Sequence, residues 1–493
     1  MKRILAVALC LLMLLGVFAS CGGNKPPQPG PEGTTDGADT SVSTDPPVTT
    51  EYPVMPENAK YDGYEFLALV AKYRSNTMND FSVENENFAV VNEAIFKRNE
   101  KIAELFDCSI DFVEVVGSAF GNGPSFQKVR ADYTASQSSY DVCAVSTYDA
   151  PQLAVNQYII DLEEIPFIDL TRNWWDQQAN NDLCVAGRMY YSTGDISISD
   201  NLATHCILFS KPLAEENNIT DLYQLVSEKK WTYDRFAEYA RGVSKDLNGD
   251  DLIDVNDRYG LLCWNDGFQA SIAGIKGRIC TVNEDGLIEN TMYSERNAAM
   301  ADKICELFFN SSVSFNHANN KIDTVSASLA DYFSEGHGLF YMTMFSAVPA
   351  LRDLTDFGIL PYPLYDEEQE SYGSYMGSTY SVMYCVENFV EDLERTGAFM
   401  EMLAYQSKIY VTPAYYEQTL KGRDVKDEES IVSLDIIFAN RTFDVGILYK
   451  IGSYTGDLTN MIKEGTNKFT RIYETKRRAA QVMIDQINKN FQK

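Results

Sequence analysis

The sequence predicts an α/β protein built of two lobes. Its 493 residues are enough for two lobes with separate hydrophobic cores. From residue 61 onward, strand and helix patterns alternate, which is the order expected of a largely parallel sheet with helices on its faces. The sequence carries no internal repeat, so we do not expect a stack of similar units.

The first lobe is expected to begin with a β-α-β-α-β unit. The apolar run 66–70 predicts a buried strand, and apolar residues spaced by three or four over 88–106 predict a helix. The remaining expected strands lie at 110–115, 141–145, 203–209, 338–342 and 380–386, and the remaining expected helices at 126–135, 232–244, 293–309, 391–407 and 457–491.

The first 21 residues have the pattern of a secretion signal. Lys2 and Arg3 precede the apolar run 4–18, which is short for a membrane span, and small residues follow it. Because Cys21 comes directly after an Ala-Ser pair, the segment resembles a bacterial lipoprotein signal. That resemblance implies cleavage before Cys21 and attachment of diacylglycerol to it. The alternative is an ordinary signal peptide that ends near a cysteine.

Residues 22–60 are expected to form a disordered tether between this signal and the folded body. They hold eight of the chain's 16 prolines and almost no large apolar residues. The whole chain has a formal net charge of −30, which repels nucleic acid and anionic lipid. We therefore expect no nucleic-acid partner, and membrane contact only through the lipid anchor.

The cysteines give no sign of a disulfide framework. Of ten cysteines, Cys10 and Cys21 belong to the signal, and the others are scattered without a CxxC pair. Most lie in apolar contexts, where a free thiol packs as a small hydrophobic group. We expect unpaired thiols, with disulfides as the alternative.

The sharpest local motif is the acidic stretch 246–257. Calcium-binding loops place oxygen ligands at positions 1, 3, 5, 7, 9 and 12. Position 6 is Asp251 in place of glycine, and position 12 is Asp in place of Glu, which resembles dockerin-type loops. We expect a structural Ca²⁺ here, with a solvated turn as the alternative. The expected ligands are Asp246, Asn248, Asp250, the Leu252 carbonyl, Asp254 and Asp257.

Several short segments occur in a recognisable order. They are WTYDRF at 231–236, YGL at 259–261 after the acidic stretch, FSEGHGLF at 333–340 and FGILPYP at 357–363. Together these segments resemble extracellular solute-binding proteins of family 1, the sugar-binding lipoproteins of ABC importers. The third segment departs from the family, because His337 replaces a common lysine. The resemblance covers most of 61–450.

The resemblance implies a periplasmic-binding-protein-like fold, in which hinge-crossing strands join two lobes and the ligand lies in a cleft between them. Lobe 1 would comprise 61–197 plus 362–405, and lobe 2 would comprise 198–361 plus 406–493. The implied protein is a monomer anchored to the outer face of a bacterial cell membrane. It would capture a sugar, expected to be an oligosaccharide, and present it to ABC permease subunits.

Candidate ligand-binding residues follow strand ends or lie near the expected crossings, because strand ends line such clefts. Aromatic rings stack on sugars, and carboxylates, amides and hydroxyls bind their hydroxyl groups. The alternative for any Trp or Tyr is packing in the core, which we expect for Trp231. The candidates are Tyr148, Asp149, Trp174, Trp175, Asp195, Asp200, Trp264, Asp266, Thr343, Tyr375 and Ser378, with Trp264 and Asp149 the leading pair.

Motifs of catalysis are absent from the sequence. It contains no HExxH, GxSxG, P-loop or complete GxGxxG, and its three histidines have no ligand spacing. We therefore expect a binding protein and no enzyme. A surface glycoside hydrolase and a glycan-binding adhesin or sensor remain the alternatives.

Overall fold

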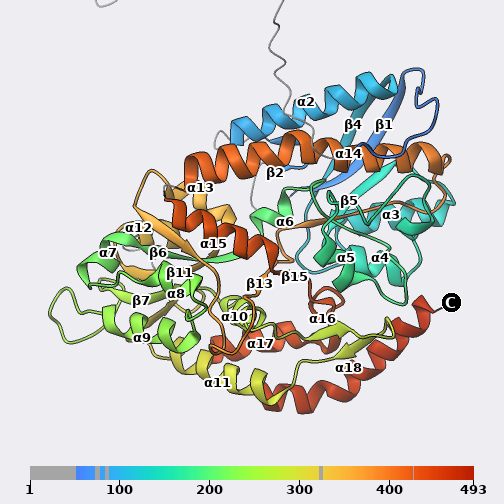
Figure 1. Cartoon of the computed structure of the whole chain (residues 1–493). Coiled ribbons are helices and arrows are strands. Elements are labelled where there is room, and N and C mark those ends of the chain that lie inside the picture. The colour runs from blue at the N-terminus through green and yellow to red at the C-terminus, as the bar shows by residue number, and fades with distance from the viewer. Residues whose placement is uncertain (1–50, 73–77, 84–87, 321–325, 426, 493) are drawn as a thin grey trace, which may run out of the picture. The chain divides into compact units, whose positions relative to one another are not determined.

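The computed structural model describes residues 51–72, 78–83, 88–320, 326–425 and 427–492. The expected signal segment, Cys21 and the tether up to residue 50 lie outside these residues. The chain from Val48 to Lys493 forms one compact unit. Its fold is mixed α/β, as the sequence predicted, with two principal sheets that are each packed against helices (Figure 1).

The first sheet has the strand order β14-β5-β1-β4. Strand β1 (Tyr64–Lys72) pairs in parallel with β4 (Cys108–Val116) and β5 (Val142–Ser146), and β14 (Val382–Cys385) runs antiparallel beside β5. Strand β5 is buried along its whole length, as expected for its apolar residues 142–145 in a sheet covered on both faces. The β-α-β-α-β start expected for the first lobe is confirmed.

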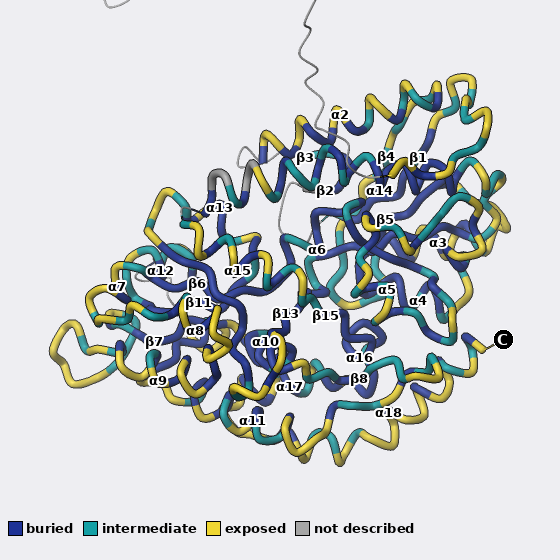
Figure 2. Tube along the Cα trace, viewed as in Figure 1, coloured by how far each residue is buried: buried dark blue, intermediate teal, exposed yellow. Residues whose placement is uncertain are grey.

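Helices α2 (Ala89–Phe106) and α14 (Leu393–Pro413) pack against each other beside this sheet (Figure 1). Helix α2 buries one face at helical spacing and exposes the other (Figure 2). Phe399 of α14 stacks on Phe66 of β1 with ring centroids 4.0 Å apart. The helix α14, late in the sequence, therefore completes the core that β1 begins.

The second sheet has the order β10-β7-β11-β6-β12. Strands β10, β7 and β11 are parallel, and β6 runs antiparallel to both β11 and β12. Trp231 is fully buried beside this sheet, and its indole N–H donates to the Pro361 carbonyl at 3.0 Å, which confirms its expected core role. The strands are β6 (His205–Ser210), β7 (Tyr259–Cys263), β10 (Ser314–Asn316), β11 (Gly338–Met344) and β12 (Phe357–Leu360).

Two segments, 193–204 and 361–381, connect the principal sheets. Within the second segment, β13 (Ser374–Tyr375) pairs in parallel with β15 (Arg441–Thr442). Gly194 begins the first crossing with φ 150°, and a Cβ there would lie 2.4 Å from the Trp174 carbonyl oxygen. Only glycine fits this close approach of two backbones.

The described residues also form shorter strands and further helices. They are β2 (Met78–Asn79), β3 (Ser82–Val83), α3 (Pro124–Ala135), α4 (Ala150–Val155), η2 (Leu162–Glu164), α5 (Gln177–Leu183), α6 (Ser199–Leu202), α7 (Lys211–Glu216), α8 (Leu222–Ser227), α9 (Tyr233–Val243), α10 (Gly267–Gly274), β8 (Cys280–Val282), β9 (Ile288–Asn290), α11 (Glu295–Phe308), α12 (Leu329–Ser334), η3 (Phe345–Ala347), α13 (Val348–Leu351), η4 (Ala414–Asp424), α15 (Glu428–Ala439), α16 (Val445–Leu448), η5 (Ile451–Ser453), α17 (Tyr454–Glu464) and α18 (Phe469–Phe491).

Both ends of the folded body differ from expectation. Residues 51–60 were expected in the tether, but Tyr52 packs edge-on against Tyr405 with ring centroids 5.3 Å apart, so the body begins earlier. The single helix expected over 457–491 is two helices, α17 and α18, because Gly465 ends the first in a left-handed conformation with φ 64°. The residues at which the two lobes divide stay a prediction.

Two further features of the described residues concern the state of the cysteines and the character of the helices. All eight cysteines of the body are free, as expected, and burial raises the pKa of the Cys143 thiol. Within the described ranges, no helix has both the length and the apolar character that crossing a bilayer requires.

Candidate ligand-binding site

An exposed indole and a carboxylate follow the carboxyl end of β7. Trp264 is 42% exposed, and its ring lies edge-on against His317, which follows the neighbouring strand β10, with centroids 4.3 Å apart. The Asp266 side chain, at the start of α10, is 48% exposed. Adjacent parallel strands end at the same edge of a sheet, which brings the rings of Trp264 and His317 together. Core packing is thereby excluded for Trp264, and its ligand role stays a prediction.

Buried polar rings lie beside Asp266. The His205 ring, at the start of β6, is 5.0 Å from the Tyr375 ring, and its Nε2 atom is 3.9 Å from an Asp266 oxygen. Burial lowers the pKa of His205, although Asp266 opposes this, and burial raises the pKa of Tyr375. Both rings are therefore neutral near pH 7. Thr343, on the adjacent strand β11, is also buried.

On the first sheet, Tyr148 follows the carboxyl end of β5. The Nζ atom of Lys450 lies 4.6 Å from the Tyr148 ring centre and 5.6 Å from that of Phe120, and it donates to the Phe120 carbonyl. Burial raises the pKa of Tyr148, while the hydroxyls of Ser378 and Thr379 lower it. Two of the predicted residues, Tyr148 and Ser378, are thus neighbours.

The Asp149 carboxylate is fully used in hydrogen bonds to the start of α3. Asp149 is fully buried, and its carboxylate accepts hydrogen bonds from the Gly123 N–H at 2.8 Å, the Ser125 hydroxyl at 2.6 Å and the Phe126 N–H at 3.2 Å. This geometry leaves no exposed carboxylate oxygen for a ligand. The predicted contact with sugar hydroxyls is therefore not supported, and Asp149 positions α3 beside Tyr148.

Trp174 and Trp175 form a separate, buried group. Their indole N–H groups donate to the two carboxylate oxygens of Glu401 on α14, at 3.0 and 2.9 Å. Burial raises the pKa of Glu401 to about 7, although both indole donors act in the opposite direction. Because both rings are buried, the structure does not support stacking of a ligand on them. Both residues do line a cavity beside α14.

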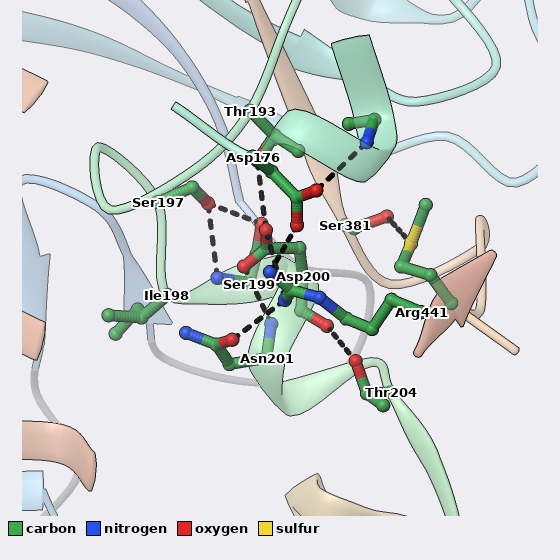
Figure 3. A network of polar contacts seen from close by, with 12 residues as sticks. Asp176, Thr193, Ser197, Ile198, Ser199, Asp200, Asn201, Thr204, Ser381 and Arg441 are labelled. Atoms are coloured by element: carbon green, nitrogen blue, oxygen red, sulfur yellow. Dashed lines mark hydrogen bonds and ion pairs between the residues drawn. The ribbon is translucent and has the colours of Figure 1, made fainter. Parts of the chain in front are cut away.

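Asp195 and Asp200 belong to a network of ion pairs at the first crossing. Arg441 pairs with Asp176 and, at 3.3 Å, with Asp200 (Figure 3). Burial raises the pKa of Asp200 to about 7, although Arg441 opposes this. Asp195 pairs with Lys408 at 3.0 Å. These carboxylates hold crossing segments together through their ion pairs.

The structure adds residues that the sequence reasoning missed. His205 and His317 are not among the predicted ligand residues, but both border them. His205 begins β6 and His317 follows β10, and both positions lie at the sheet edge where β7 ends, which could have identified them. No local signal marks Lys450, because its contact with Phe120 spans 330 residues of sequence.

The acidic stretch 246–257 gathers a donor set that fits calcium. Carboxylate oxygens of Asp246, Asp250 and Asp257 lie within 4.8 Å of one another, and hard oxygen ligands of this kind suit Ca²⁺. The loop is also held without a metal, since Asp246 accepts the Gly249 N–H at 2.6 Å. The Nδ1 atom of His337, in the FSEGHGLF segment, donates a hydrogen bond to the Asp257 carbonyl at 2.7 Å and so ties this segment to the end of the loop. Calcium occupancy stays a prediction.

Comparison with solved structures identifies the class of fold as that of ABC solute-binding proteins. A substrate-binding protein from Listeria monocytogenes, solved with cycloalternan, is 13% identical, with 87% of this chain and 99% of that chain covered and a TM-score of 0.53. The GacH receptor of Streptomyces glaucescens, solved unliganded and with acarbose, is 13% identical over 87% of this chain and 98% of its own, with a TM-score of 0.53. UgpB from Mycobacterium tuberculosis, with glycerophosphocholine, is 14% identical over 86% and 99%, with a TM-score of 0.55.

These likenesses confirm the two-lobe α/β fold that the sequence resemblance implied. A scan against protein-family models finds no match, and a search of the curated proteins finds none either. The ligands of the three solved structures differ in chemistry, so they do not identify the ligand of this chain.

Proposed function

We propose that this protein captures a carbohydrate, in particular an oligosaccharide, outside the cell and presents it to the permease of an ABC importer. The observation that carries the proposal is that the exposed indole of Trp264 and the half-exposed carboxylate of Asp266 both follow the carboxyl end of β7. An exposed aromatic ring can stack on the apolar face of a sugar, and a carboxylate at the same strand end can accept hydrogen bonds from the sugar's hydroxyl groups.

The surroundings of this pair suit a neutral, hydroxyl-rich ligand. His205 and Tyr375 present polar atoms without charge, because burial keeps both rings neutral. Among the described residues, His205 Nδ1 has no hydrogen-bond partner. Capture needs no covalent step: the ligand binds, and the connected lobes close on it by hinge motion. The protein is in this account a binding protein and no enzyme.

The proposal includes a place in the cell. The signal-like residues 1–21 favour export, and lipidation of Cys21 would hold the protein at the outer face of a bacterial membrane. The cargo would then pass to the membrane permease, with the protein acting as a monomer. Two of the solved structures that share the fold were solved with saccharides, cycloalternan and acarbose, which supports this class of cargo.

A thermal-shift screen of mono- and oligosaccharides on the purified protein tests the proposal. A ligand at a hundredfold excess over its Kd adds roughly 2.7 kcal/mol to the free energy of unfolding, which raises the melting temperature measurably. Chromatography of each hit should show the saccharide unchanged. Released products would instead favour a glycoside hydrolase, and a screen without any hit would contradict carbohydrate capture.

A further inference from the structure

A cavity lies beside Arg441, between α14 and α15. Its volume is about 340 Å³, at the lower end of the range of about 300–1,000 Å³ typical of small-molecule sites. Trp175 and Asp195 line it from the first sheet's side, Lys408 and Tyr416 from α14 and η4, and Arg441 from β15. The proposed function does not use this cavity.

The cavity is separate from the group around Trp264. In the β13–β15 pair, Ser374 lies opposite Arg441 and Tyr375 lies opposite Thr442. Successive side chains of a strand point to opposite faces, so Arg441 and Tyr375 lie on different sides of this pair. None of Trp264, Asp266, His205 or Tyr375 lines the cavity.

Charge within the lining favours a neutral occupant. Each charged residue of the lining is held in an ion pair: Lys408 with Asp195 at 3.0 Å, Arg441 with Asp176, and Asp435 with Lys421 at 3.2 Å. An anion would meet three lining carboxylates, and a cation would meet Lys408 and Arg441. An ionic ligand would therefore have to break an existing pair.

The lining also combines rings with hydrogen-bonding groups. Tyr416 and Phe438 pack edge to face with centroids 5.4 Å apart, and the Tyr416 hydroxyl donates to Asp435 at 2.5 Å. The Asn201 oxygen accepts from Arg441 at 2.8 Å, while its amide N–H groups are donors for an occupant. Hydroxyl groups can both donate to the carboxylates and accept from the amides without disturbing the ion pairs.

We infer that this cavity is a second binding site, for a neutral polyhydroxylated molecule of monosaccharide or alditol size. Its position gives such binding a consequence. Helix α15 packs on β12 of the second sheet, and α14 packs on α2 beside the first. An occupant therefore contacts elements attached to both sheets, and if it prefers one hinge arrangement, it changes the affinity at Trp264 by linkage.

Saturation-transfer NMR tests the inference with D-glucose, D-galactose, D-xylose and D-mannitol as probes. The purified protein carries Trp264→Ala, so that the proposed carbohydrate site is weakened in every sample. To this background we add Tyr416→Ala, which removes the ring, or Asn173→Trp, which places an indole at the cavity rim. Tyr239→Ala is the matched control, because the Tyr239 hydroxyl likewise donates to one carboxylate, that of Asp221 at 2.7 Å, and neither residue lines the cavity.

At least one probe should bind to the Trp264→Ala background and to its Tyr239→Ala derivative. Binding should weaken about tenfold or more in the Tyr416→Ala and Asn173→Trp derivatives. If Tyr416→Ala unfolds the protein, as a melting curve reveals, Asn173→Trp decides. The inference is overturned if no probe binds, or if binding is the same in the cavity variants and the control. Neither result depends on whether an oligosaccharide binds at Trp264 in the wild type.

Discussion

Replacing Glu401 by glutamine should change the free energy of unfolding in a way that depends on pH. Glu401 is fully buried, and its two oxygens accept one indole N–H each, from Trp174 and Trp175. In the Glu401→Gln variant, the amide offers one oxygen and one NH₂ group. One indole N–H is therefore left facing another donor, at a cost of about 1–3 kcal/mol.

In the wild type, ionisation of the buried Glu401 carboxyl at high pH lowers the free energy of unfolding. Burial raises the pKa of Glu401 from 4.5 to about 7, and this difference corresponds to about 3 kcal/mol at 1.36 kcal/mol per unit. Because the folded pKa is the higher one, the unfolded chain releases this proton first. The wild type therefore loses stability as the pH rises from about 4.5 to about 7 and keeps it below that range.

Urea denaturation at about pH 5 and about pH 8 measures both effects. We expect Glu401→Gln to be the less stable protein by about 1–3 kcal/mol at the lower pH. At the higher pH the deficit should shrink by about 3 kcal/mol, to near zero or to a small advantage. The exposed Glu238→Gln is the control and should change neither value. A deficit that is the same at both pH values, or larger at pH 8, would refute a buried acid with a raised pKa.

Three further predictions concern other parts of the chain. If Ca²⁺ fills the acidic loop, EDTA should lower the melting temperature and Asp250→Ala should abolish that sensitivity, whereas a melting curve indifferent to chelator and to added Ca²⁺ would leave only the solvated turn. Cys21→Ala should abolish metabolic lipid labelling and release the protein from the membrane fraction, and unchanged labelling would refute the lipoprotein signal. Asp149→Ala should lower the free energy of unfolding by about 1–3 kcal/mol, because the N–H groups of Gly123 and Phe126 lose their acceptor; a variant as stable as the wild type would contradict this positioning role.

Most of the scaffold could be predicted from local sequence patterns. The apolar run around Phe66 predicts a buried strand, and the helical spacing of Val91, Ile95 and Ile102 predicts a helix with one buried face. The structure has the strand β1 and the helix α2 at these positions. The pattern could not reveal the break at Gly465, because apolar residues continue on both sides of it. Glycine in the left-handed conformation ended the helix there.

The candidate site was less predictable, because its geometry depends on contacts between distant segments. Trp264 and Asp266 follow one strand, so their place at its carboxyl end could be predicted from the sequence alone. The pairing of Arg441 with Asp176 spans 265 residues of sequence, and the hydrogen bond between Trp174 and Glu401 spans 227. No local pattern could therefore predict that these side chains already have partners within the protein. Asp149 was placed at the correct strand end, but its hydrogen bonds to α3 could not be foreseen.

Calorimetric titration of the Trp264→Ala variant with a saccharide from the screen tests the central claim most directly. The indole is exposed and makes one edge-on ring contact, with His317, so its removal should cost under about 1.5 kcal/mol of stability. Affinity should fall at least tenfold, or about 1.4 kcal/mol. Tyr293→Ala is the matched control, since Tyr293 is 39% exposed and stacks on a single ring, that of Tyr473, at 5.0 Å; it should bind like the wild type. Wild-type affinity in the Trp264→Ala variant would contradict capture of a carbohydrate at this site.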